Sequence, residues 1–208
     1  MKNILISNKL IFDQHNSIGS FYDHQWDNFF KGKKFNLLTL PYRNLNYSSF
    51  ADLKIKAVIL SGGNDLYIFK KNILNKKRDL IENKLLKICQ KNRIPILAVC
   101  RGYQFITKKF YGKLIKTNNH TSQNHKINLI KNNFLKTKKQ EINVNSFHTY
   151  KVVKLPKSFF SIGVANDKSI ELAYSPQKRI LAMMFHPERK NYSNKIIKKL
   201  IFNFFEKC

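Results

Sequence analysis

Short apolar runs alternate along the chain with longer segments whose apolar residues recur at helical spacing. The runs Lys56–Leu60 and Ile94–Val99 resemble strands that are buried on both faces of a parallel sheet. Between them, Ile81, Leu85 and Ile88 mark the apolar face of a helix. This alternation predicts an α/β fold in which helices cover both faces of a mostly parallel central sheet. We also expect strands at Asn3–Ser7, Phe35–Leu40 and Arg179–Phe185, helices at Gln25–Phe30, Tyr103–Tyr111 and Ile196–Phe205, and short strands and turns over Lys113–Val153.

No repeat, low-complexity tract or flexible linker interrupts this pattern, so residues 1–208 are expected to form one three-layer domain. A hydrophobic content of 43% is enough for a substantial core and excludes a disordered chain. The early run Ile4–Ile6 is too short for a signal peptide or a membrane span, so we expect a cytoplasmic protein with no membrane contact. Three cysteines without paired spacing predict no disulfide framework.

One cysteine lies where a buried strand is expected to turn into a helix, in the sequence Ala98-Val99-Cys100-Arg101-Gly102. A nucleophile on such a turn projects from the carboxyl end of the sheet, and the residues two before and two after it must be small. Ala98 and Gly102 meet that requirement. The helix N-terminus favours a thiolate, and it directs the backbone N–H of Arg101 towards a developing oxyanion. We therefore expect Cys100 to be a nucleophile, although an isolated cysteine usually serves as a small buried hydrophobic residue.

Four segments, in this order, resemble the class I glutamine amidotransferases and, within them, the stand-alone γ-glutamyl hydrolases. Together they cover most of the chain and are more specific in combination than any one of them alone. The usual nucleophile motif of the family has Gly where this chain has Ala98, which is a conservative difference in size. The four segments are ILSGGNDL (Ile59–Leu66), ILAVCRGYQ (Ile96–Gln104), VNSFHTYKV (Val144–Val152) and MMFHPE (Met183–Glu188).

The family resemblance implies a Cys-His-Glu triad of Cys100, His186 and Glu188. In this triad His186 takes the thiol proton and later protonates the leaving amine, while Glu188 holds the imidazole in the useful tautomer. Residues i and i+2 of an extended segment point to the same side, although His-Pro-Glu alone could be only a turn that closes a strand. Three other histidines are alternative bases in segments that look like loops, and no zinc site is expected from them because no HxxxH or CxxC pair occurs. These histidines are His120, His125 and His148.

The segment Ser61-Gly62-Gly63 follows a predicted strand and is either an ordinary strand-ending turn or part of the site. The resemblance implies that the N–H of Gly63 completes an oxyanion hole with that of Arg101. It also implies that Gln104 contacts a glutamyl group and that the signature segment Asn145–His148 lies beside the substrate. For each of these positions a turn or a packed edge is the open alternative. The substrate-binding candidates are Gly62, Gln104, Asn145, Ser146, Phe147 and His148.

The formal net charge of +27 suggests nucleic-acid binding, but the composition argues against it. Only six of the 39 basic residues are arginines, and arginine is the usual side chain for reading bases and phosphates. The lysines are scattered along the chain, as a bias in composition would leave them. A basic surface can still favour an anionic small-molecule substrate.

The resemblance implies a two-step hydrolysis in which Cys100 forms a γ-glutamyl thioester that water then cleaves, with no metal or organic cofactor. The short length, the Ile59–Leu66 loop and the turn at Cys100 are similar to those of γ-glutamyl-CDP-amidate hydrolases, which serve bacterial capsule modification. This similarity implies an anionic nucleotide substrate. The alternatives are a γ-glutamyl-GABA-type hydrolase, a glutaminase that supplies ammonia to a separate synthetase partner, and a nonenzymatic nucleic-acid-binding protein.

Overall fold

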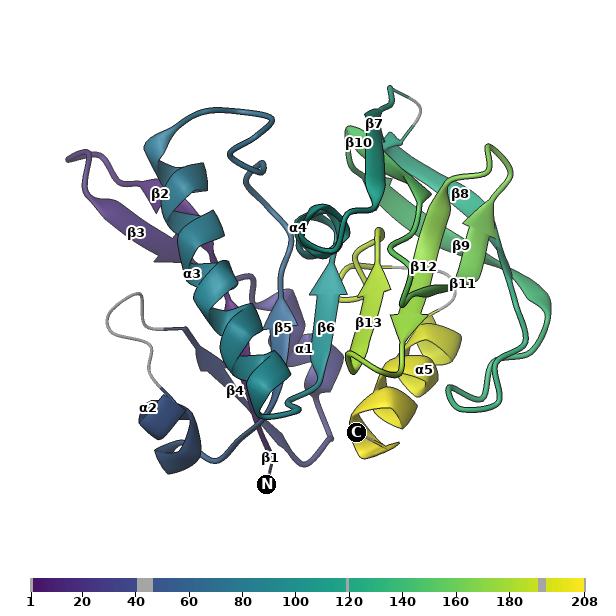
Figure 1. Cartoon of the computed structure of the whole chain (residues 1–208), viewed down its shortest axis with the longest axis horizontal. Helices are drawn as coiled ribbons and strands as arrows, with labels where there is room; N and C mark the ends of the chain where they lie inside the picture. The colour runs from purple at the N-terminus through teal and green to yellow at the C-terminus, as the bar shows by residue number, and fades with distance from the viewer. Residues whose placement is uncertain (1, 41–46, 119, 191–193, 208) are drawn as a thin grey trace.

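A computed structural model describes residues 2–40, 47–118, 120–190 and 194–207. Within these residues, nine strands form one sheet in the order β4-β1-β5-β6-β13-β12-β11-β8-β9 (Figure 1). The pairs from β4 to β13 are parallel and those from β13 to β9 are antiparallel, so that all strands except β12 and β8 run in the same direction. The strands are β1 (Lys2–Ser7), β4 (Phe35–Thr39), β5 (Ile55–Leu60), β6 (Ile96–Val99), β8 (Thr121–Leu129), β9 (Gln140–Phe147), β11 (Phe160–Ala165), β12 (Ile170–Ser175) and β13 (Ile180–Met183).

Helices cover both faces of this sheet. Successive side chains of a strand point to opposite faces, so Ile4 and Ile6 pack in one hydrophobic core while Leu5 packs in the other. The first core includes α1 (Gln25–Phe30) and α5 (Asn194–Lys207). The second core is built against α2 (Tyr47–Asp52), α3 (Ile73–Lys91) and α4 (Arg101–Lys109). The predicted α/β fold with helices on both faces of a central sheet is confirmed.

Two small antiparallel sheets flank the main one. The strands β2 (Lys9–Phe12) and β3 (Ile18–Phe21) form a hairpin, and β7 (Lys113–Lys116) pairs with β10 (Tyr150–Lys154). The β2–β3 hairpin, α2, β11 and β12 were not predicted from the sequence. The expectation of only short strands and turns in the region of β8 and β9 was wrong, because these strands form a long antiparallel hairpin that contains His125.

The three segments that carry predicted site residues all follow the carboxyl ends of strands in the main sheet. Ser61 follows β5, Cys100 follows β6, and the chain from β13 leads to His186. The strands β5, β6 and β13 are adjacent and parallel, so their carboxyl ends lie side by side. Ligands of open α/β sheets usually bind outside these carboxyl ends. The topology therefore brings together residues that are far apart in the sequence.

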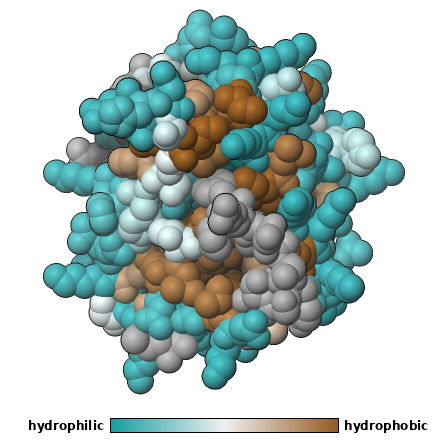
Figure 2. Space-filling model, turned by 90° about the vertical axis from the view of Figure 1, so that its left-hand side faces the viewer, coloured by the Kyte–Doolittle hydropathy of each residue, from teal (hydrophilic) through white to brown (hydrophobic). Residues whose placement is uncertain are grey.

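The surface near α2 and the β2–β3 hairpin is mostly hydrophilic, with hydrophobic residues exposed in its middle (Figure 2). A shallow hollow between the hairpin and α3 is lined by Leu10, Ile18, Leu80 and Ile81, together with two lysines. None of the helices in the described residues is long and apolar enough to cross a membrane.

Leu97 lies in the middle of β6 and is fully buried. We expect Leu97→Ala to lower the free energy of unfolding by about 2–5 kcal/mol, because it removes buried methyl groups and leaves a cavity. The control is Leu80→Ala on α3, where the side chain is 55% exposed and the expected change is within about 0.5 kcal/mol. Urea denaturation of both variants measures the difference. Equal losses of stability would contradict the assignment of β6 to the centre of the core.

Candidate active site

Cys100 occupies a strained turn between β6 and α4. Its backbone angles are φ 50° and ψ −105°, a combination that is unfavourable for a residue with a side chain. The N–H of Cys100 donates to the carbonyl of Met183 at 2.8 Å, which fixes the turn to β13. A Cβ atom on Gly102 would lie only 2.2 Å from the carbonyl oxygen of Leu60. The close approach of α4 to β5 is therefore the reason for a small residue after the turn, as the sequence predicted.

His186 connects Cys100 with Glu188. Its Nδ1 lies 2.6 Å from Oε1 of Glu188, and its ring lies near Cys100, because a Cβ atom on Gly62 would be 3.1 Å from Nε2 of His186 and 3.4 Å from Cβ of Cys100. All three residues are buried. Burial lowers the pKa of His186, but the negative charges of Cys100 and Glu188 and the hydrogen bonds to both outweigh it and raise the pKa to about 10. This arrangement favours the protonated form of the His186 imidazole.

Asn145, at the end of β9, holds the backbone of His186. The N–H of His186 donates to Oδ1 of Asn145 at 2.8 Å, and Nδ2 of Asn145 donates to the carbonyl of His186, also at 2.8 Å. The ring of Phe147, two residues after Asn145, packs edge-on against the imidazole of His186, with ring centroids 5.9 Å apart. These contacts fix the position of the histidine from the antiparallel half of the sheet.

The loop Ser61-Gly62-Gly63 lies directly against the Cys100–His186 pair. A Cβ atom on Gly62 would be 2.4 Å from Cε1 of His186 and 3.4 Å from Cβ of Cys100. The guanidinium of Arg78 donates to the carbonyls of Ser61 at 2.8 Å and of Gly62 at 3.0 Å, and also to that of Gly63. Because a trans peptide directs its C=O and the next N–H to opposite sides, this anchoring turns the N–H of Gly63 away from Arg78.

A buried network of charges joins this loop to the start of α4. Nε of Arg78 lies 3.0 Å from Glu82, which also accepts a hydrogen bond from Ser7 at 2.8 Å. The side chain of Arg101 forms ion pairs with Glu82 and with Asp79. Burial raises the pKa of Glu82, but the charges of Arg101 and Arg78 outweigh it and lower the pKa overall. The network therefore keeps Glu82 ionised between two buried guanidinium groups.

This network was not predicted from the sequence, where only the backbone N–H of Arg101 was assigned a role. Arg78 and Glu82 are four residues apart on α3 and share its buried stripe with Leu85 and Cys89. A charged pair at this spacing in an apolar stripe is a signal that could have revealed the network.

The structure places the substrate-binding candidates in different environments. Gln104 is buried on α4, and its Nε2 lies 3.9 Å from Sδ of Met184. The hydroxyl of Ser146 donates to the carbonyl of His120 at 2.7 Å, so this side chain, like that of Asn145, is used within the protein. Phe147 is 44% exposed beside His186. The substrate contacts of these residues remain predictions.

The alternative bases His120, His125 and His148 gather around Glu171 of β12, whereas the histidine near Cys100 is His186. Among the described residues, His120, His148 and Glu171 are near enough to one another to hold a metal ion.

A cavity of about 50 Å³ lies on the side of the loop that faces α1 and the β2–β3 hairpin. Gly62, Gly63 and His186 line this cavity. Its lining also includes the charged and aromatic side chains of Lys9, Tyr22, Asp23, Trp26, Glu188 and Arg189. A substrate group that extends from Cys100 past Gly62 would meet these residues.

Gly62→Ala tests the contact between the loop and the pair Cys100–His186. The new methyl group would displace His186, and we expect turnover to fall about 100-fold relative to the unchanged protein, the size of loss that a small misplacement produces. Turnover of the folded variant, measured with the substrate that the unchanged protein cleaves, shows the effect. Gly19→Ala is the matched control, because its nearest neighbour would be an ordinary contact at 3.9 Å. Unchanged turnover in Gly62→Ala would contradict the described packing.

Glu188→Gln tests the electrostatic support of His186. The carboxylate is one of the charges that raise the pKa of His186 to about 10, so its removal should lower that pKa and deprotonate the imidazole at a lower pH. NMR titration of the His186 ring measures the shift. Glu141→Gln, an exposed change of the same chemistry, should leave the titration of His186 as it is in the unchanged protein. If the titration midpoint of His186 is the same in Glu188→Gln as in the unchanged protein, the electrostatic pairing of His186 with Glu188 is refuted.

The chain is similar to known proteins over most of its length. The family model described as Peptidase C26 matches residues 37–188. The chain is 37% identical over 164 residues to the γ-glutamyl-CDP-amidate hydrolase of Campylobacter jejuni, which covers 79% of this chain and 76% of the relative. It is 28% identical over 156 residues to a glutamine-hydrolysing GMP synthase subunit of Methanococcus aeolicus, and the aligned region covers 74% of this chain and 75% of that relative.

Solved structures share the fold. A protein assigned as a GMP synthase subunit from Thermoplasma acidophilum superimposes with a TM-score of 0.74 at 19% identity, over 100% of this chain and 94% of the other. A glutamine amidotransferase from Thermotoga maritima gives a TM-score of 0.68 at 16% identity, over 99% and 96%. The extent of the family match and the identity to the Campylobacter relative show that this chain belongs to the Peptidase C26 family, which is class I glutamine amidotransferase-like.

Proposed function

We propose that the protein is a cysteine hydrolase that cleaves a γ-glutamyl amide, with Cys100, His186 and Glu188 as its triad. The observation that carries this proposal is the buried series of Cys100, His186 and Glu188, in which His186 lies 2.6 Å from Glu188, beside a loop in close contact with both the cysteine and the histidine. Membership of the Peptidase C26 family supports hydrolysis of an amide bond. The expected cytoplasmic location remains a prediction.

In the first step, the thiolate of Cys100 attacks the γ-carbonyl carbon, and the negative charge moves to the carbonyl oxygen. Backbone N–H groups of Gly63 and Arg101 stabilise this oxyanion. His186, protonated beside Cys100, donates its proton to the amine nitrogen as the C–N bond breaks. The amine leaves, and a γ-glutamyl thioester remains on Cys100.

In the second step, neutral His186 takes a proton from water, and the resulting nucleophile attacks the thioester carbonyl. The C–S bond breaks, glutamate leaves and the thiolate is restored beside the imidazolium. Glu188 stabilises the protonated imidazole in both steps through the 2.6 Å contact to Nδ1. Asn145 keeps the ring in place by binding the His186 backbone.

For the leaving group we propose a cytidine diphosphoramidate, so that the substrate is γ-glutamyl-CDP-amidate and the pathway is capsule polysaccharide modification. The 37% identity to the Campylobacter hydrolase supports this choice. The cavity beside Gly62 is lined by cationic Lys9 and Arg189, which could meet a phosphate at its mouth, together with acidic Asp23 and Glu188. The net charge of +27 further favours an anionic substrate.

A glutaminase that delivers ammonia to a separate synthetase is the second candidate. The similarity to a glutamine-hydrolysing GMP synthase subunit over 74% of the chain favours it. In that case glutamine is the substrate, and a synthetase partner increases its hydrolysis.

The test is glutamate release from γ-glutamyl-CDP-amidate, γ-glutamyl-GABA and glutamine. We expect the nucleotide to be preferred, a γ-glutamyl adduct on Cys100 in the mass of the quenched protein, and a loss of about 10⁴-fold in turnover in Cys100→Ala. Cys89→Ala, a change of the same chemistry at a buried cysteine on α3, should remain active. Lys9→Gln should raise KM for the nucleotide more than for glutamine.

Two outcomes would reject parts of the proposal. Full turnover in Cys100→Ala would contradict the proposed mechanism, in which Cys100 is the nucleophile. Preference for glutamine, increased by a synthetase, would replace the nucleotide hydrolase by the second candidate.

A further inference from the structure

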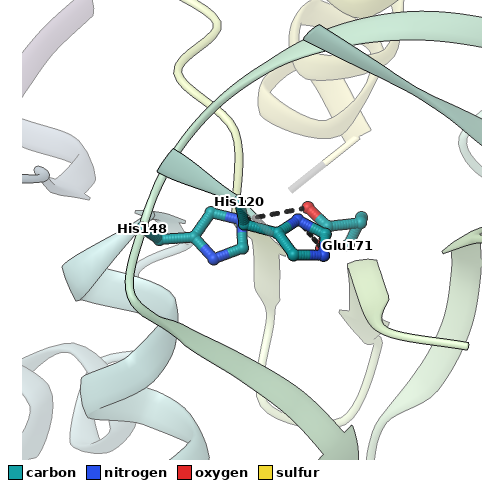
Figure 3. A group of neighbouring side chains, drawn as sticks. All are labelled: His120, His148 and Glu171. Carbon is teal, nitrogen blue, oxygen red and sulfur yellow. Dashed lines mark ion pairs between the residues drawn. The ribbon is translucent and has the colours of Figure 1, made fainter. Parts of the chain in front are cut away.

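Three histidines from separate segments surround one buried carboxylate. His120 precedes β8, His125 lies within β8 and His148 follows β9, whereas Glu171 projects from β12. Figure 3 shows the rings of His120 and His148 and the carboxylate of Glu171 directed towards one another. The side chains of Glu171 and His148 are fully buried, and His125 closes the group from a partly exposed position.

The distances in this group are too long for hydrogen bonds. Oε2 of Glu171 lies 3.6 Å from Nε2 of His125 and 3.7 Å from Nε2 of His148, and Oε1 lies 3.9 Å from Nδ1 of His120. Nitrogen–oxygen hydrogen bonds are about 2.7–3.2 Å long. Within the described part of the chain, these three nitrogens and Oε2 have no hydrogen-bond partner. Buried polar atoms normally have one, so the group as it stands is incomplete.

A metal ion would satisfy all these atoms at once. Ligand atoms at about 2.0–2.2 Å from a tetrahedral zinc ion lie about 3.3–3.5 Å from one another. The carboxylate–imidazole separations of 3.6, 3.7 and 3.9 Å are close to this geometry, while the ligand atoms of His120, His148 and Glu171, which all lie within 4.8 Å of one another, would have to draw together by up to about 1.4 Å. Imidazole nitrogen and carboxylate oxygen are ligands that zinc accepts.

The outer nitrogens of two rings are already bonded in the manner of metal ligands. Nδ1 of His148 donates to the carbonyl of Tyr150 at 2.9 Å. Nε2 of His120 lies 2.9 Å from Asp167, which is itself held by Lys151 and Ser169. A proton on each outer nitrogen leaves the inner one with a free lone pair, and such hydrogen bonds to carbonyls and carboxylates orient metal-binding histidines.

We propose that His120, His125, His148 and Glu171 form a closed tetrahedral site for one zinc ion. Four protein ligands leave no position for a substrate, which makes the site structural rather than catalytic. No zinc site was expected from the sequence, because the spacings in the chain lack HxxxH and CxxC pairs, but here the ligands are brought together by strand pairing. The proposal also gives the imidazole of His148 a role other than the substrate contact that the resemblance implied.

The ion would stabilise the segment that holds the catalytic base. The carbonyl of His120 accepts hydrogen bonds from the N–H of His148 at 2.9 Å and from the hydroxyl of Ser146 at 2.7 Å. Asn145, the next residue, binds the backbone of His186. A zinc ion between β8, β9 and β12 would therefore fix the end of β9 and, through Asn145, the position of His186.

The test is metal binding by the full chain carrying Cys100→Ala, which removes a thiol that could itself bind zinc. We expect one Zn²⁺ per chain by elemental analysis and calorimetry, and the visible absorption of tetrahedral Co²⁺ when cobalt replaces it. Adding Glu171→Gln or His125→Gln should weaken Zn²⁺ binding at least about 100-fold. His24→Gln is the matched control, because this histidine is exposed and far from the group in sequence.

Circular dichroism and the melting temperature without metal show whether each variant is folded. If Glu171→Gln does not fold, His125→Gln still tests the proposal, because the side chain of His125 is partly exposed and its replacement is better tolerated. Zn²⁺ should raise the melting temperature of the Cys100→Ala protein and not that of its His125→Gln derivative. Folded Cys100→Ala protein that binds neither Zn²⁺ nor Co²⁺, or equal binding in the His125→Gln and His24→Gln derivatives, would overturn the proposal. Neither result depends on which γ-glutamyl substrate the enzyme uses.

Discussion

The buried guanidinium of Arg78 holds the three carbonyls of the loop after β5, and the catalytic geometry depends on this contact. Arg78 is itself fixed by Glu82, which also binds Arg101 at the first turn of the helix that follows Cys100. Both predicted halves of the oxyanion hole, Gly63 and Arg101, are thus tied to one carboxylate on α3. Loss of one partner of such a buried pair costs about 3–5 kcal/mol, because the other charge stays buried and uncompensated.

Such a network also limits how the site can move. The loop carries no large side chain that could anchor it by packing, since Gly62 must leave room for the imidazole of His186. Its position is therefore set by backbone carbonyls bonded to Arg78, and their geometry is specific in both direction and distance. The mainly apolar sheet supports the strands, while charged groups determine where the loops that follow them lie.

The fold could be predicted because its signals are local, whereas the roles of His186 and Glu188 rested on the family resemblance. The turn at Cys100 is specified by Ala98 and Gly102 within a few residues, and the apolar runs define the parallel strands. The histidine group could not be predicted in this way. His120 and His148 become neighbours because β8 and β9 pair with Thr121 opposite Phe147, and this register is invisible in the spacing of the chain. The β2–β3 hairpin was missed because its strands are short and weakly patterned.

The proposed nucleophile and the proposed base come from differently supported halves of the sheet. Cys100 follows β6 in the parallel half, whereas His186 follows β13, where parallel pairing with β6 gives way to antiparallel pairing with β12. The backbone of His186 is held by Asn145 of β9, the strand at the antiparallel edge, so that edge must curl back towards the site. A change at the β9 edge therefore acts first on His186 through Asn145, whereas a change in β13 acts on both residues, because the N–H of Cys100 is bonded to Met183 of that strand.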